Sequence, residues 1–261
     1  MKIAILSDVH GNITALDAVL EDVQSIGGVD EYWVLGDLVA LGPLPVPVLE
    51  RLHTLPKVQY VRGNTDRYVV SGERPYPHPH HVKEDFSLLS RLLQVTDGFS
   101  WTRGAITAHG WFPFLAGLPL ELRVELPDGT RFLGVHASPG NDDGQGIHPD
   151  ISDEALHALF AGCEADLVCV EHTHWPAKRQ MSGVQVINLG SVSNPIVPGL
   201  AATYCLLNAE SDGYQIEHRA VAYNREAVLA QITEVAHPAA DFLAKFMRGE
   251  MIKSAWGTPD L

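Results

Sequence analysis

The sequence predicts an α/β (α+β) protein in which two mixed β-sheets are covered by outer helices, with a small helical cap insertion. Apolar runs at the start alternate with helical patterns, which is typical of a largely parallel sheet. Later apolar runs lie closer together in the sequence and indicate a second group of strands that we expect to be antiparallel. No repeat, low-complexity run or linker divides the chain, so we expect one domain over residues 1–261.

The first strands are predicted by continuous apolar runs that end in polar residues. "KIAILSD" has the pattern of a strand buried on both faces, and apolar residues spaced from Ile13 to Val23 mark one helical face after it. "EYWVLGD" and "VQYVRGN" repeat the strand pattern, with the Pro-rich helical or turn segment "GPLPVPVLERLHTL" between them. Three strands are therefore expected to end at Asp8, Asp37 and Asn64.

The pattern weakens from residue 68 to about 118, where we expect a cap insertion with one helix in "EDFSLLSRLLQV" and another in "WTRGAITAHGWFPFL". A hairpin at residues 128–129 follows, then a strand running into His136 and a helix over residues 153–160. Further strands are expected in "ADLVCVEHTH", "VQVINLGS", "ATYCLLNA" and "GYQIEHRAV". A helical tail is expected from residue 224 to about 251.

Charge and cysteine content restrict the partners and the compartment. The 18 basic and 32 acidic residues give a net charge of −14, which would repel nucleic acid but not a small phosphorylated molecule. Cys163, Cys169 and Cys205 lack CxxC spacing and indicate a reducing environment without disulfides. The apolar run before Asp8 is too short for a signal peptide or a membrane span, so we expect a cytoplasmic protein with no membrane partner.

Seven ligand-type side chains lie at or just past the ends of predicted strands: Asp8, His10, Asp37, Asn64, His136, His172 and His174. Because the ends of strands in one sheet converge, these groups are expected to meet in one cleft. Seven such groups suit two divalent metal ions that share a bridging carboxylate. The absence of sulfur favours Mn²⁺, Fe or Zn²⁺ over a soft ion; we expect Mn²⁺, with Fe and Zn²⁺ as alternatives.

Five ordered blocks, "DVHGN", "GDLVALG", "RGNTD", "GVHASP" and "EHTH", resemble the calcineurin-like metallophosphoesterase superfamily from Met1 to about Asn208. "VRGNTD" and "NLGSVSNP" look most like its small bacterial phosphodiesterases and dinucleoside tetraphosphatase-like members. The resemblance implies a four-layer αββα sandwich and a binuclear centre. It implies one metal bound by Asp8, His10, Asp37 and His174, and the other bound by Asp37, Asn64, His136 and His172.

The resulting hypothesis is a two-metal-dependent phosphoesterase, most simply a phosphodiesterase, that hydrolyses a small phosphodiester or nucleotide by attack of a metal-bridging hydroxide. Asp37, Asn64 and His136 are its predicted catalytic residues. The alternatives are a metal-binding but catalytically weak regulatory or scaffold protein, and phosphomonoesters or dinucleoside polyphosphates as substrates. Thr65 stands where many phosphomonoesterases of the superfamily have a proton-donating His, which favours leaving groups that depart without protonation.

Other residues near the predicted strand ends could support the site, and three of them, Arg62, Arg67 and Asn12, have two interpretations each. Arg62 and Arg67 could bind a phosphate oxygen or could be plain surface charges. Asn12 could donate to phosphate, although a helix N-cap is the interpretation we favour. Asp66 is expected to orient a metal ligand.

Glu171 stands where the resembled family usually has Gly before His-x-His. If the stretch stays extended, side-chain alternation places His172 and His174 on one face and Glu171 on the other, which we favour. If the position instead requires a positive φ, Glu171 would carry strain of about 1–2 kcal/mol. A contact with a ligating imidazole and an altered site are the remaining alternatives.

The oligomeric state is open on the sequence alone, and a homo-oligomer is one option. Trp111, Phe112 and Phe114 could form a dimer face or belong to the core, and we favour the core.

Overall fold

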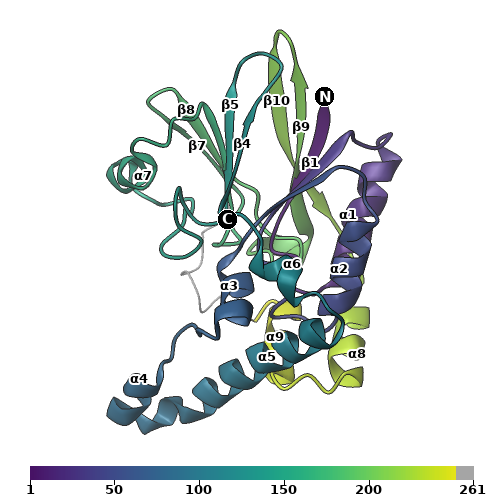
Figure 1. Ribbon diagram of the computed structural model, residues 1–261, viewed down its shortest axis with the longest axis vertical. Coiled ribbons are helices and arrows are strands. Elements are labelled where there is room, and N and C mark those ends of the chain that lie inside the picture. The colour runs from purple at the N-terminus through teal and green to yellow at the C-terminus, as the bar shows by residue number, and fades with distance from the viewer. Residues whose placement is uncertain (251–261) are drawn as a thin grey trace.

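The protein is a sandwich of two five-stranded β-sheets with helices on the outer sides (Figure 1). The structure is a computed structural model that describes residues 1–250. The first sheet has the strand order β10-β9-β1-β2-β3, and the second has the order β4-β5-β6-β8-β7. This arrangement confirms the predicted fold class of two mixed sheets with outer helices.

The strands of the first sheet are β1 (Lys2–Leu6), β2 (Glu31–Leu35), β3 (Val58–Val61), β9 (Ala202–Glu210) and β10 (Gly213–Val221). Those of the second are β4 (Glu121–Glu125), β5 (Arg131–Val135), β6 (Leu167–Val170), β7 (Ala177–Met181) and β8 (Val184–Asn188). β1, β2 and β3 are mutually parallel, as are β5, β6 and β8. Asp37 Oδ2, just after β2, and His136 Nε2, just after β5, lie 3.5 Å apart, so the carboxyl ends of both sets of parallel strands lie at one end of the sandwich.

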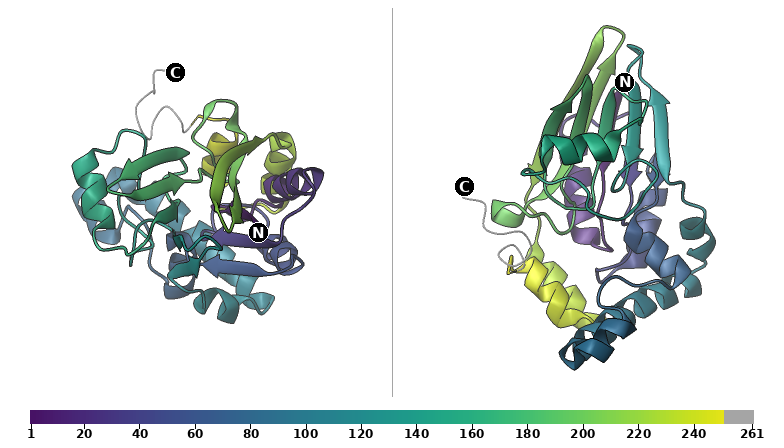
Figure 2. Two further views of the ribbon diagram at one scale, coloured as in Figure 1. Left: turned by 90° about the horizontal axis from the view of Figure 1, so that it is seen from above. Right: turned by 90° about the vertical axis from the view of Figure 1, so that its left-hand side faces the viewer.

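The helices are α1 (Ile13–Ser25), α2 (Pro45–His53), α3 (Asn64–Ser71), α4 (Pro79–Glu84), α5 (Leu89–Ala108), α6 (Phe112–Ala116), α7 (Asp153–Phe160), α8 (Arg225–Glu234) and α9 (Ala240–Met247), with short 3₁₀ turns η1 (Phe86–Leu88) and η2 (Pro198–Leu200). α1 and α2 cover the first sheet and α7 covers the second (Figures 1 and 2). α5 and α9 meet at the end of the molecule that faces away from the β9–β10 hairpin (Figure 2, right). Within residues 1–250, no helix is both long and apolar enough to cross a membrane.

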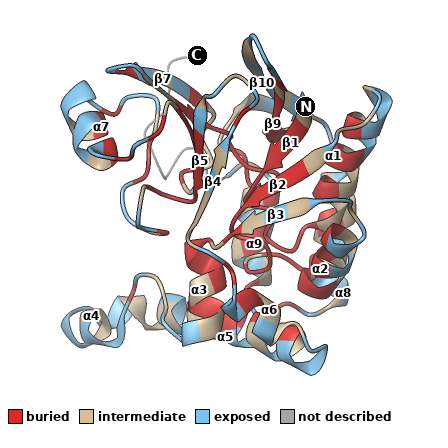
Figure 3. Cartoon of the chain, turned by 45° about the horizontal axis from the view of Figure 1, so that its top comes forward, coloured by how far each residue is buried: buried red, intermediate tan, exposed pale blue. Residues whose placement is uncertain are grey.

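Apolar side chains from both sheets interlock between them, where strand residues are buried (Figure 3). The rings of Trp33 and Phe132 lie 4.5 Å apart, centroid to centroid, across this interface. Gly134 lies so close to the facing sheet that a Cβ atom there would come within 2.9 Å of Leu35 Cδ2. The two sheets are thus packed tightly where β2 and β5 approach the site.

Two predictions about the elements were wrong. The two helices expected in the cap region are largely one continuous helix, α5, which runs through Gly98. Gly98 is buried, and a Cβ there would lie 3.5 Å from Ala239 Cβ, so close helix packing accounts for this glycine. The strands β6 and β8 are parallel rather than antiparallel, because the unpredicted strand β7 lies between them in sequence and returns the chain.

The tail prediction agrees with α8 and α9 up to Met247, and its end at residue 251 lies outside the described residues. Trp111, Phe112 and Phe114 are partly buried and pack against the core beneath α1 and α2.

Candidate metal centre

The seven ligand-type side chains predicted from the sequence come together at the carboxyl ends of the parallel strands. Asp8 and Asp37 each follow a strand of the first sheet by two residues, and Asn64 begins α3 after β3. His136 follows β5 directly, and His172 and His174 lie in the turn after β6. Residues from both sheets therefore build one site.

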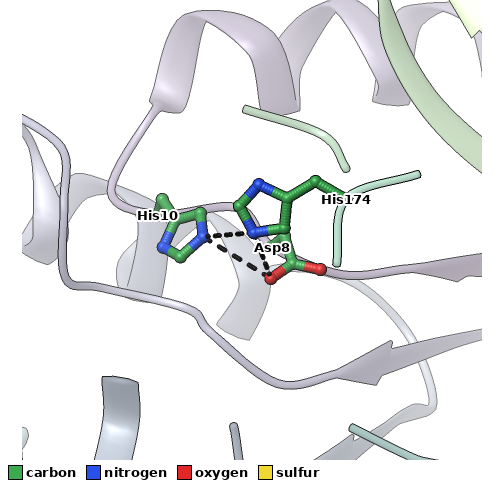
Figure 4. Close-up of side chains that lie close together, drawn as sticks. All are labelled: Asp8, His10 and His174. Atoms are coloured by element: carbon green, nitrogen blue, oxygen red, sulfur yellow. Dashed lines mark hydrogen bonds and ion pairs between the residues drawn. The ribbon is translucent and has the colours of Figure 1, made fainter. Parts of the chain in front are cut away.

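One cluster consists of Asp8, His10 and His174 (Figure 4). Asp8 Oδ1 lies 3.2 Å from His174 Nε2 and 3.5 Å from His10 Nε2. The two Nε2 atoms are 3.3 Å apart. Three potential donor atoms thus face a common point, as the ligands of a divalent ion must.

A second cluster adjoins the first through Asp37. Asn64 Oδ1 lies 3.0 Å from His136 Nε2 and 3.1 Å from His172 Nδ1. Asp37 Oδ2 lies 3.5 Å from His136 Nε2 and 3.8 Å from His10 Nε2. Asp37 is therefore the carboxylate that lies between the two clusters.

The histidine rings are oriented by backbone carbonyls, which accept from the ring nitrogen that faces away from the cluster. The pairs are His10 Nδ1 to Ala40 O at 2.8 Å, His136 Nδ1 to Leu35 O at 2.9 Å, His174 Nδ1 to Asn194 O at 3.0 Å and His172 Nε2 to Gly144 O at 2.9 Å. This second hydrogen bond is the usual support of a metal-binding imidazole, because it fixes the tautomer and the ring plane. All four rings have the form needed to bind a cation.

The carboxylates show the clearest fit to a metal. Both oxygens of Asp8 are fully buried and have no hydrogen-bond partner among residues 1–250. Burial opposes its ionisation, but His174 and His10 outweigh that effect and hold the pKa of Asp8 well below its ordinary value. Burial also disfavours the charged form of His136, yet Asp37 and Asp8 raise its pKa to about 10. A buried carboxylate that faces two imidazoles and accepts no hydrogen bond from the described residues suits a bound cation, which would replace the imidazole protons.

Five of the seven side chains sit on left-handed backbone, a conformation that is unfavourable for any residue with a Cβ atom. The φ angles are 52° at Asp8, 47° at His10, 55° at Asp37, 73° at His172 and 59° at His174. Each costs about 1–2 kcal/mol, and such strain persists mainly at functional sites. The fold therefore holds these ligands in place at the expense of local stability.

Asp66 and Gly63 fix the position of Asp37. Asp66 accepts hydrogen bonds from the backbone N–H of Asp37 (2.8 Å), Leu38 (2.9 Å) and Gly63 (3.1 Å). Thr65 N donates to Asp37 Oδ1 at 2.9 Å, which leaves Oδ2 to face the histidines. A Cβ atom on Gly63 would lie 2.0 Å from Asp37 Oδ1, so only glycine fits there.

The extended conformation expected around Glu171 was wrong. β6 ends at Val170, and the positive φ angles fall on His172 and His174 rather than on Glu171. Glu171 is fully buried, and its Oε1 accepts from Leu189 N at 3.2 Å. Burial and the nearby Asp8 carboxylate raise the pKa of Glu171 well above its ordinary value. The side chain thus lies behind Asp8, without the backbone strain considered for this position.

Asn188, which sequence reasoning did not single out, holds the turn that carries His172. Its Nδ2 lies 3.1 Å from Glu171 O and 2.9 Å from Thr173 Oγ1, and its Oδ1 accepts from Gly190 N at 2.9 Å. Its place at the start of "NLGSVSNP" was the one feature of the sequence that could have indicated a role near the site.

The proposed substrate-binding residues have protein partners. Asn12 is buried and caps α1, accepting from Ala15 N at 3.0 Å. Arg62 Nε and Arg67 Nε donate to opposite oxygens of Asp142 at 2.7 and 2.9 Å. Asp142 lies in the loop "GNDDG", and nothing in that sequence indicated that it would pair with the two arginines.

Residues 1–212 match the family model described as the calcineurin-like phosphoesterase superfamily domain. The chain belongs to the calcineurin-like phosphoesterase superfamily. This membership confirms the resemblance seen in the five sequence blocks, and it supports a metal-dependent hydrolase of phosphoric esters.

Individual proteins are similar to this chain over different shares of its length. An uncharacterized protein of Methanocaldococcus jannaschii is 27% identical over 248 residues, which cover 89% of this chain and 92% of that protein. A metallophosphoesterase crystal structure from Sphaerobacter thermophilus is 26% identical with a TM-score of 0.73, covering 95% of this chain and 99% of that one. A symmetrical bis(5'-nucleosyl)-tetraphosphatase of Psychromonas ingrahamii is 26% identical over 174 residues, 56% of this chain and 62% of that enzyme.

Proposed function

We propose that this protein is a two-metal phosphoesterase that hydrolyses a small phosphodiester or nucleotide. The observation that carries the proposal is the pair of ligand clusters joined by Asp37, whose Oδ2 lies 3.8 Å from His10 Nε2 and 3.5 Å from His136 Nε2. Asp8, His10 and His174 would complete one metal site. Asn64, His136 and His172 would complete the other.

When bound, two divalent ions acidify a water molecule and bind phosphate oxygens, so the protein need not supply a nucleophile. Its own residues fix the geometry: Asp66 and Thr65 N hold Asp37, and the backbone carbonyls orient the imidazoles. Arg62 retains two Nη groups without partners among residues 1–250, which supports a contact with a phosphate oxygen. Mn²⁺ is the ion we propose, since the donors are oxygen and nitrogen.

Thr65 supports a substrate whose leaving group needs no proton. It is buried, its hydroxyl has no hydrogen-bond partner among the described residues, and an alcohol is no acid near pH 7. Aryl and pyrophosphoryl oxygens leave as anions more easily than alkoxides do. The tetraphosphatase among the relatives acts, by its name, on a nucleotide anhydride, which agrees with this proposal.

Hydrolysis of bis-p-nitrophenyl phosphate by protein stripped of metal and reloaded with Mn²⁺, Fe²⁺ or Zn²⁺ tests the proposal. We expect turnover that depends on metal and is lost in Asp37→Asn. The exposed Asp212, in the turn between β9 and β10, offers a control in Asp212→Asn, which should retain full activity. Absence of hydrolysis with every ion would favour a binding or scaffold role.

A further inference from the structure

A cavity of about 230 Å³ adjoins the proposed metal centre. Asn64 and Thr65, at the start of α3, form the part of its wall that reaches the ligand clusters. The remaining wall comes from Leu41, from α3 and the segment after it, from α5, and from residues 237–242, which include the start of α9. The last of these lies beyond residues 1–212, so the cavity is partly built by a region outside the matched family domain.

Aromatic and aliphatic side chains dominate the lining. Tyr68 and Phe99 are buried and pack edge to face, with ring centroids 5.7 Å apart. Val95 on α5 and Phe242 on α9 add further apolar surface. The volume is below the roughly 300–1,000 Å³ of pockets for drug-sized ligands, so it suits a single ring system.

His237 adds a polar group to this apolar wall. It is 4% exposed, and its Nδ1 accepts from Ala239 N at 3.0 Å, so the ring proton resides on Nε2. Burial lowers the pKa of His237 to about 4, so the ring is neutral near pH 7. Its Nε2–H has no hydrogen-bond partner among residues 1–250. The ring packs edge to face on Trp101, 4.6 Å between centroids, and also lines the cavity. Buried donors are normally paired, and an acceptor on a ligand in the cavity would fill that role.

We propose that this cavity binds an aromatic heterocycle of the substrate, as in a nucleobase, and that a ring acceptor pairs with His237. The inference rests on the proposed function, because the cavity places such a ring beside Asn64 and hence beside the phosphate. An alkyl chain would fill the same apolar space but would leave the His237 N–H unpaired. His237 and Phe242 would therefore determine specificity without touching the reacting phosphorus.

Binding of phosphonates, whose C–P bond resists hydrolysis, isolates this contribution. Mn²⁺-loaded protein is titrated calorimetrically with methylphosphonate, phenylphosphonate and the 5′-methylenephosphonate analogue of adenosine monophosphate. We expect the adenosine compound to bind about tenfold tighter than methylphosphonate, as stacking of one base provides, with phenylphosphonate between them. Equal affinity for all three would overturn the inference.

Phe242→Ala should remove most of the gain for the adenosine compound and leave methylphosphonate binding unchanged. Phe114→Ala is the matched control, because Phe114 on α6 is also half-buried, does not line the cavity and packs against His53 and Tyr60 rather than against Phe242. Equal losses in both variants would contradict a role for the cavity. Val95→Trp, which fills the space from α5, tests the same point if Phe242→Ala does not fold.

His237→Asn retains an acceptor for Ala239 N and removes the Nε2–H donor. It should lower adenosine-compound affinity to that of phenylphosphonate, whose ring has no acceptor; an unchanged difference would overturn the assigned hydrogen bond. Binding of methylphosphonate without an aromatic gain would contradict only this inference. Failure of every phosphonate to bind would contradict the proposed function itself and this inference with it.

Discussion

Replacing Asn188 with alanine tests whether the ligand geometry depends on the residues behind it. Asn188 is fully buried, and its amide lies within hydrogen-bond distance of Ile147 O, Glu171 O and Thr173 Oγ1. Its two amide hydrogens can make two of these bonds at once, and its Oδ1 accepts a third from Gly190 N. At about 0.5–1.5 kcal/mol net per bond, Asn188→Ala should destabilise the metal-free protein by about 3 kcal/mol.

The same variant should bind Mn²⁺ roughly 10–100-fold more weakly, because Glu171 and Thr173 flank His172. Urea unfolding of metal-free protein and calorimetric Mn²⁺ titration measure the two effects separately. Asn208→Ala, a change of the same type on β9, should alter neither. Loss of stability with unchanged Mn²⁺ affinity would refute the reasoning, since Asn188 would then support the fold without positioning the ligands.

Three further predictions concern the site itself. Gly63→Ala should abolish metal binding, because the added Cβ would lie 2.0 Å from Asp37 Oδ1. Gly104→Ala, the control, adds its Cβ to open space and should bind metal normally. Metal content measured by mass spectrometry compares the two variants. Mn²⁺ affinity should rise about tenfold per pH unit near neutrality, because His136 must lose its proton to bind the metal. Burial opposes the charged form of His136, but Asp37 raises its pKa to about 10. An Mn²⁺ affinity that does not change with pH would contradict this. Thr65→His should increase turnover of alkyl phosphodiesters by roughly tenfold or more by supplying an acid, and should leave p-nitrophenyl esters nearly unchanged; equal effects on both would contradict that role.

The strands that carry the site could be predicted because their residues are buried on both faces. β1 and β2 are continuous apolar runs, and the polar residues that end them, Asp8 and Asp37, could be expected to converge at one sheet edge. The helix at residues 153–160 has the predicted bounds; in the structure Ser152 caps it, and Asp153 and Glu154 lie in its first turn.

The rest depended on tertiary contacts that a single sequence does not display. β7 escaped prediction because its sequence, AKRQM, is mostly polar, as an edge strand can be. The single helix α5 runs through Gly98, where the missing side chain permits close packing on Ala239, a contact that the sequence of this segment does not reveal. The orientation of Glu171 depends on the positive φ angles at His172 and His174. The alternation of side chains along an extended strand does not predict such angles.

The central claim is that two metal ions lie on either side of Asp37. Anomalous diffraction at the manganese edge, from crystals of Mn²⁺-loaded protein, tests it most directly. We predict two peaks per chain that share Asp37 as a ligand, one also bound by Asp8, His10 and His174 and the other by Asn64, His136 and His172. A single peak, or peaks away from Asp37, would contradict the two-metal mechanism.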